Sequence, residues 1–320
     1  MKERLVRMHL CSKFDRWLES IEDAAVKEVA RKNTIITGGC IVSLLCGEEV
    51  NDYDLYFRTK EAAENVARYY VGKIKECPPT MFKDGDKSVD IQVKSSDDRV
   101  KIVIKSAGIA GSAGSNDYQY FETLPNEEAG DAATEFSESV LQAEGLDERH
   151  DAEIKPSEQP GDEPKKRYRP RFASANAVTL TDKVQIILRF FGEPDAIHEN
   201  YDFVHCTSYW TSWDRKLVLR PEAVVAILTK DLRYVGSKYP ICSLIRTRKF
   251  IKRGWNINAG QYLKMAWQVS KLNLNDPRVL EDQLIGVDAA YFAQLLLALS
   301  EKDPNTVDGA YLMTVIDRLF

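Results

Sequence analysis

The spacing of hydrophobic and polar residues predicts amphipathic helices in two parts of the chain. Near the N-terminus, apolar side chains recur three and four positions apart over 12–32 and over 60–74, and Thr59 is the expected N-cap of the second helix. Beyond about residue 220 the same periodicity fills most of the chain. The helices expected there cover 221–232, 242–254, 259–272 and 288–300.

Between these helices the pattern changes to β-rich runs. Alternating residues over 87–93 and 99–106 predict a hairpin, and the apolar runs 184–191 and 200–210 predict two further strands. The sequence therefore favours an α+β fold, in which a mixed sheet of roughly five strands with helices is followed by an all-helical domain. The expected domains are 1–215 and 216–320.

The stretch TIITGGCIVSLLCGEEVNDYDLYF, residues 34–57, reads as a strand, a Gly-Gly turn, a short helix and a second strand. Successive side chains of a strand point to opposite faces, so Asp52 and Asp54 are expected on one face of the sheet. Two neighbouring carboxylates repel each other unless a cation lies between them, which favours a divalent metal site. A solvent-facing polar strand is the alternative. The residues expected to face the core are Tyr53, Leu55 and Phe57.

Composition describes an ordinary globular protein, with 44% hydrophobic and 29% charged residues in a chain of 320. No apolar run reaches the roughly 18 residues of a membrane span, and the N-terminus lacks the apolar core of a signal peptide. The six cysteines include no CxxC pair and the four histidines no HxxxH pair. A zinc site is therefore not expected, and the cytoplasm is the expected compartment.

Charge is unevenly distributed along the chain. Residues 126–163 hold thirteen acidic residues against Arg149 and Lys155, a net charge of −11. This segment has too few aromatic and β-branched residues to bury much surface, so 107–175 is predicted to be a mobile acidic insertion. The basic cluster KKRYRPR at 165–171 is open to two interpretations, a solvated loop end or a phosphate contact.

A basic stretch opposes the acidic one. Residues 215–253 contain eleven basic residues and two acidic ones, a net charge of +9. Such a surface suits a nucleic-acid backbone or a triphosphate, with a solvated helix face as the alternative. The aromatic residues expected to stack on bases are Tyr234, Tyr239 and Trp255, whereas Trp210 and Trp213 are expected to pack at the domain junction.

The opening stretch resembles the signature of the polymerase-β-like nucleotidyltransferase superfamily, in which a Gly-Gly turn precedes an Asp-x-Asp strand. The resemblance implies that Gly38 and Gly39 bind a nucleoside triphosphate at a helix N-terminus. It also implies that Asp52 and Asp54 hold Mg²⁺, or Mn²⁺, and activate an acceptor hydroxyl. Ser43, on the same helix, is a further expected nucleotide contact.

A second resemblance lies in SLIRTRKFIKRGWNI at 243–257, which is similar to a helix of class II poly(A) polymerases and CCA-adding enzymes. It implies that Arg248 and Arg253 contact the nucleotide. The stretch GGCIVSLLCG departs from the class II motif, since Val42 and Ser43 replace its Arg and Asp, so neither the nucleotide nor a tRNA acceptor can be carried over. The chain also resembles nucleotidyltransferase-like proteins of tailed bacteriophages, which implies the host cytoplasm as its compartment.

The superfamily completes its metal site with a third carboxylate on a neighbouring strand. Asp202, in YDFVHC, is favoured by its late position in the chain, and Asp90, in SVDIQV, is the alternative. For either residue an ordinary ion pair with Lys or Arg is the competing explanation. His205 is expected to be a packed strand residue rather than a catalytic base.

Two classes of function remain open. The first is an active nucleotidyltransferase that moves NMP from an NTP to an acceptor hydroxyl, with an RNA 3′ end favoured over another nucleic acid or a protein hydroxyl. The second is a catalytically idle protein of the same fold that binds nucleic acid or a protein partner. The presence of both Asp52 and Asp54 favours activity, because an idle protein has no electrostatic reason to keep two neighbouring carboxylates.

Overall fold

The structure, a computed structural model, describes residues 2–76, 90–96, 99–105, 168–173 and 176–274, together with residues 276, 279, 283 and 313. Most of the predicted mobile insertion 107–175, including its acidic part 126–163, and the helix expected at 288–300 lie outside these residues. Residues 168–173 of the predicted insertion are described, and Pro170–Ala173 form a strand of the central sheet. Among the described residues, no helix is long and apolar enough to cross a membrane.

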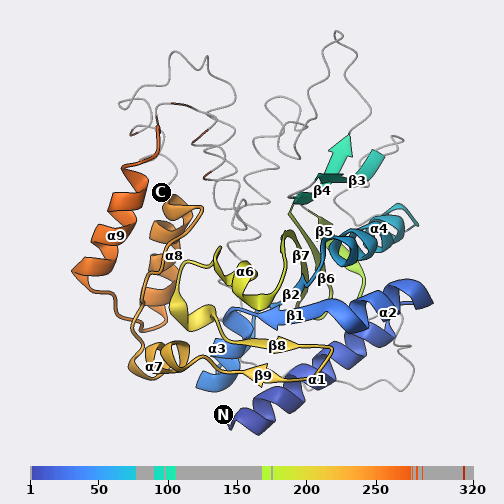
Figure 1. Cartoon of the computed structure of the whole chain (residues 1–320), viewed down its shortest axis with the longest axis horizontal. Coiled ribbons are helices and arrows are strands. Elements are labelled where there is room, and N and C mark those ends of the chain that lie inside the picture. The colour runs from blue at the N-terminus through green and yellow to red at the C-terminus, as the bar shows by residue number, and fades with distance from the viewer. Residues whose placement is uncertain are drawn as a thin grey trace, which may run out of the picture.

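A seven-stranded mixed sheet forms the centre of the fold, in the order β5-β6-β7-β2-β1-β8-β9 (Figure 1). Strand β1 is antiparallel to β2 and β8, whereas β2 and β7 are parallel. The bounds are β1 Thr34–Thr37, β2 Tyr53–Phe57, β5 Pro170–Ala173, β6 Ala177–Leu180, β7 Val184–Phe191, β8 Tyr209–Thr211 and β9 Leu217–Val218.

This sheet confirms the predicted α+β class, with more strands than the roughly five expected. Short strands such as β5, β6 and β9 carry too few residues for a clear alternation. The predicted hairpin forms from β3 (Asp90–Ser96) and β4 (Arg99–Lys105), but it makes a separate two-stranded sheet. The main sheet ends at Val218, three residues beyond the expected domain boundary at 215.

The helices in chain order are α1 Glu3–Glu19, α2 Ala24–Asn33, α3 Gly39–Cys46, α4 Lys60–Glu76, α6 Pro194–His198, α7 Pro221–Thr229, α8 Pro240–Lys252 and α9 Ala259–Val269, with the 3₁₀ turn η4 at Val204–Cys206.

The prediction of one helix over 12–32 was wrong. Its two parts are separated because the Asp23 carboxylate caps a new helix by accepting hydrogen bonds from the amides of Ala25 and Val26. The predicted cap of α4 is confirmed, since Thr59 Oγ1 accepts from Ala62 N at 3.2 Å.

The largest apolar core lies on one face of the sheet. The side chains of Tyr53, Leu55 and Phe57 on β2 pack there with residues of α1 and α4, which confirms the predicted alternation. Trp210 of β8 is fully buried in the same core, where its ring packs on Phe14 of α1, rather than at a junction with the helical part. This face is therefore closed, and any chemistry on β2 belongs to the opposite face.

The helices α7, α8 and α9 gather beside the sheet (Figure 1). A second apolar core joins them to the first part of the chain, with Val42 of α3 and Phe203 packed among Phe250, Trp255 and Met265. The strand predicted over 200–210 forms only at its end. Asp202 lies instead in an irregular segment after α6, next to an isolated bridge between Phe203 and Tyr234.

Candidate nucleotide and metal site

The Gly-Gly turn brings the backbone against the second aspartate of the Asp-x-Asp pair. Gly38 follows β1 with φ +95°, a conformation that residues with a Cβ atom rarely adopt, and serves as the N-cap of α3. A Cβ atom on Gly38 would lie 3.3 Å from Asp54 Oδ2 and 3.4 Å from Tyr201 Oη. The antiparallel register that places Thr37 opposite Asp54 explains this close approach. A Cβ on Gly39, in contrast, would meet no atom within 4 Å.

The two aspartates have different environments. Asp54 is half-buried in the second position of β2, whereas Asp52 directly precedes the strand and is exposed. On the parallel neighbour β7, Gln185 is the register partner of Asp54. The sequence pattern did not single out Gln185, because nothing in a β-rich run shows which residue will lie beside Asp54.

Neutral polar groups surround Asp54. Burial, and then the negative charge of Asp54, raise the pKa of the Cys40 thiol and of the Tyr56 hydroxyl well above their ordinary values. The pKa of Tyr201 is raised by burial, by Tyr56 and by Asp54. All three groups are therefore protonated and neutral at neutral pH.

A buried histidine fixes the residue before the glycine turn. Arg220 Nη2 donates to His198 Nδ1 at 3.3 Å, so His198 Nε2 carries the proton and donates to Thr37 Oγ1 at 2.8 Å. Thr37 Oγ1 in turn donates to the Ser208 carbonyl at 2.9 Å. Burial and the Arg220 charge lower the pKa of His198 to about 4, which keeps the imidazole neutral. His198 and Tyr201 were missed by the sequence analysis, since single residues after a short helix carry no motif.

Two of the predicted nucleotide-binding residues contact each other. Arg253, at the C-terminus of α8, donates from Nη2 to Ser43 Oγ at 3.2 Å and forms an ion pair with Glu48. Arg248 lies on the exposed side of α8. Arg253 thus ties α8 to α3 and to the residues that follow α3.

Asp202, the favoured third carboxylate, is buried and forms an ion pair with Arg246 of α8. The alternative, Asp90, begins β3 in the separate hairpin. Within the described part of the chain, no three His, Cys, Asp or Glu residues are grouped to hold a metal ion. The role of Asp202 as a metal ligand remains a prediction.

The chemistry of the two aspartates fits Mg²⁺ nonetheless. This ion prefers oxygen ligands and is commonly held by one or two protein carboxylates, with substrate phosphates and water completing its shell. Asp54, placed against the glycine turn, and Asp52, two residues before it, are donors of that kind. Such an ion would neutralise phosphate charge and activate an acceptor hydroxyl.

The basic stretch 215–253 is partly neutralised within the fold. Five of its eleven basic residues pair with carboxylates of the first part of the chain. Tyr234, Tyr239 and Trp255, expected to stack on bases, are buried instead. His205 is fully buried between Phe250 and Trp255, which confirms a packed residue, although it lies in the 3₁₀ turn rather than in a strand.

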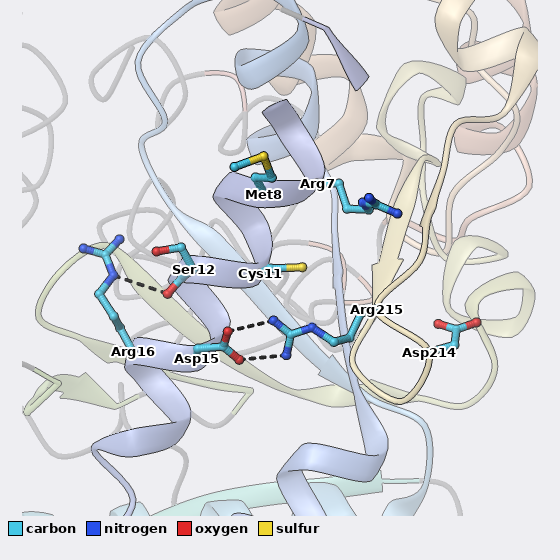
Figure 2. A pocket seen from close by; sticks show the side chains of 8 residues that line it. All are labelled: Arg7, Met8, Cys11, Ser12, Asp15, Arg16, Asp214 and Arg215. Atoms are coloured by element: carbon cyan, nitrogen blue, oxygen red, sulfur yellow. Dashed lines mark hydrogen bonds and ion pairs between the residues drawn. The ribbon is translucent and has the colours of Figure 1, made fainter. Parts of the chain in front are cut away.

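A surface hollow of about 580 Å³ lies away from this site, between α1 and the turn that joins β8 to β9 (Figure 2). Its most prominent contact is the two-pronged ion pair of Arg215 with Asp15, at 2.9 and 2.7 Å. None of the predicted site residues lines it. The lining residues are Arg7, Met8, Cys11, Ser12, Asp15, Arg16, Asp214 and Arg215.

These features define an α+β protein in which a strand, a Gly-Gly turn, a helix and an Asp-x-Asp strand follow one another. A family model matches residues 9–230, and the chain belongs to the Gabija anti-defense 2 (Gad2) family. A search of curated proteins gave no match.

Among solved structures, the chain is similar to the Thermotoga maritima CCA-adding enzyme complexed with tRNA, at 10% sequence identity and a TM-score of 0.35. The match covers 96% of this chain and 53% of that one, so the chain spans about half the length of that structure.

Proposed function

We propose that the protein is a metal-dependent nucleotidyltransferase that moves NMP from an NTP to an acceptor hydroxyl, with an RNA 3′ end as the favoured acceptor. The observation that carries the proposal is the close approach of the glycine turn to Asp54, since a Cβ atom on Gly38 would lie only 3.3 Å from Asp54 Oδ2. A phosphate-binding turn and a metal-binding carboxylate would have to meet in this way.

In this proposal the residues of the chain have distinct tasks. The Gly39 end of α3 binds the triphosphate, because no side chain blocks its backbone and the helix N-terminus favours negative charge. Asp52 and Asp54 would hold Mg²⁺, which supplies charge neutralisation and activates the acceptor hydroxyl. Tyr201 lies beside Asp54 at the glycine turn, and His198 holds Thr37 at the start of the turn.

The test is a transfer assay combined with thermal melting. Each labelled NTP is incubated with the protein, Mg²⁺ or Mn²⁺ and total RNA, and melting curves are recorded with and without Mg²⁺ and NTP. The wild type should transfer label and gain thermal stability with ligand, whereas Asp52→Asn and Asp54→Asn should do neither while remaining folded. Equal ligand-induced stabilisation of wild type and Asp54→Asn would mean that the aspartates do not form a metal site.

A second candidate is a catalytically idle protein of the same fold that acts by binding. Two observations favour it: Asp202 already pairs with Arg246, and the residue beside Asp54 on β7 is Gln185 rather than a carboxylate. The family description names an action against Gabija defence, and we propose that this chain shares it. In cells protected by Gabija, wild type should restore phage growth and Asp54→Asn should not. Equal restoration by both would favour the idle protein.

A further inference from the structure

The segment Leu232–Leu274, which contains α8 and α9, carries charged side chains of one sign only. From Leu232 to Leu274 the sequence contains no Asp or Glu, although the whole chain has 49 acidic and 44 basic residues. Of the basic residues in this stretch, Arg246 and Arg253 pair with Asp202 and Glu48. The remaining ones are exposed: Arg233, Lys238, Arg248, Lys249, Lys252, Lys264 and Lys271.

Exposed aromatic side chains lie within the same stretch, on α9. Trp267 is 66% exposed and Tyr262 is 38% exposed, whereas Trp17, Trp210 and Trp255 are buried. The ammonium group of Lys271 lies 5.2 Å from the centre of the Trp267 ring. A large aromatic ring that is left in water beside a cation is available to a ligand.

The fold does not need Trp267. The side of α9 that faces the rest of the protein uses Met265, which is fully buried, and Gln268, whose side-chain oxygen accepts hydrogen bonds from Tyr234 Oη and, at 3.2 Å, from Ser237 N. Trp267 and Leu263, one helical turn apart, point to the outer side and are 66% and 71% exposed. The outer side of α9 can therefore be altered without disturbing the core.

We propose that the outer face of α8 and α9 binds a single-stranded nucleic acid, with Trp267 stacked on a base and the exposed lysines and arginines along the phosphates. Charge complementarity favours a nucleic acid over a protein as the ligand of this surface. The segment Leu232–Leu274 contains no acidic side chain that would repel the phosphates. Base stacking on an exposed ring tolerates any sequence. This inference depends on the proposed function in one respect, that the bound strand is the acceptor of the transferred NMP.

The test measures binding separately from transfer. Fluorescence anisotropy of a labelled single-stranded RNA of about twelve nucleotides, and of a DNA of the same sequence, is recorded with the full chain at several salt concentrations. Trp267→Leu keeps an apolar side chain but removes the ring, and should weaken binding roughly 5- to 150-fold. Leu263→Ala is the matched control on the same side of α9, and should bind within about twofold of wild type. Lys252→Gln should weaken binding and lower the salt slope by about one.

The outcomes separate this proposal from the transferase proposal. If Trp267 is needed for binding but no NTP is ever transferred, the surface proposal stands and the transferase proposal falls. If the wild type fails to bind either strand at low salt, or if Trp267→Leu binds as well as wild type while melting normally, the surface proposal is overturned. Equal losses in Trp267→Leu and Leu263→Ala would also overturn it, because they would indicate a general apolar docking face.

Discussion

Asp54, beside the glycine turn that begins α3, and Asp202, beside α8, are both carboxylates, but their surroundings differ. Asp54 lies against a glycine turn and neutral hydroxyl and thiol groups, whereas Asp202 is paired with the guanidinium of Arg246. Cys206 lies close to both. After burial, Asp202 is the main charge that raises the pKa of this thiol, and Arg246 opposes that effect.

The comparison shows why a carboxylate in a motif is not yet a metal ligand. An aspartate can bind a cation at little cost only where the protein has not already supplied one. Asp202 would therefore have to exchange Arg246 for a metal ion.

The largest effects are expected from neutralising each carboxylate in turn. Asp54→Asn should abolish transfer and leave the unfolding free energy unchanged or slightly higher without metal, because a half-buried negative charge is removed. Asp202→Asn should lower the unfolding free energy by about 2–3 kcal/mol, because Arg246 is left without its buried partner. Urea denaturation measures both changes.

A double variant provides the control for the second change. In Asp202→Asn combined with Arg246→Met, part of the lost stability should return, since the unpaired guanidinium is gone. If Asp202→Asn is as stable as wild type but no longer gains stability from Mg²⁺ and NTP, the ion pair is incidental and Asp202 is the third metal ligand.

The two glycines beside Asp54 offer a matched pair of smaller effects. Gly38→Ala should cost about 1–3 kcal/mol of stability, because φ is +95° and the new methyl group would crowd Asp54 Oδ2. Gly39→Ala should leave thermal stability nearly unchanged, since nothing lies within 4 Å of the added atom. If a triphosphate occupies that open space, Gly39→Ala should still raise the KM for NTP. A Gly39→Ala enzyme with normal KM would place the triphosphate elsewhere.

The sequence was most informative where a local motif determines local geometry. The strand, turn, helix and strand over 34–57 and the burial of Tyr53, Leu55 and Phe57 were predicted correctly, since glycine and a two-residue alternation act over short distances. The break at Asp23 was missed because a four-residue interruption preserves the helical periodicity on both sides.

Residues brought together by long-range packing could not be predicted. Tyr201 and His198 reach the glycine turn only because β8 pairs with β1 and α6 folds back over the sheet. The aromatic residues show the same limit, since the sequence marked Trp255 for stacking while packing buries it and leaves Trp267 in water. Exposure depends on which face of a helix finds a neighbour, and that is a property of the whole fold.

The smallest effect concerns a positive charge that would appear on a buried histidine near Arg253. His205, three residues after Asp202, is fully buried, and its two ring nitrogens have no hydrogen-bond partner among the described residues. Burial, and then Arg253, lower its pKa to about 3, against the ordinary value of 6.5. The unfolded chain therefore takes up this proton first as the pH falls, and stability is lost between about pH 6.5 and about pH 3.

His205→Phe should remove this dependence while keeping an aromatic ring between Phe250 and Trp255. Between about pH 7.5 and about pH 5.5, the wild type should lose about 1.4 kcal/mol more unfolding free energy than the variant, the value for one proton over one pH unit below 6.5. His198, whose pKa is lowered to about 4, contributes to both proteins and cancels in the difference. Urea denaturation of both proteins at the two pH values measures this difference in unfolding free energy. If wild type and variant lose the same unfolding free energy over this pH range, His205 takes up its proton without destabilising the folded protein. A positive charge next to Arg253 would then be tolerated, and the contrast between paired and unpaired charges would not hold for His205.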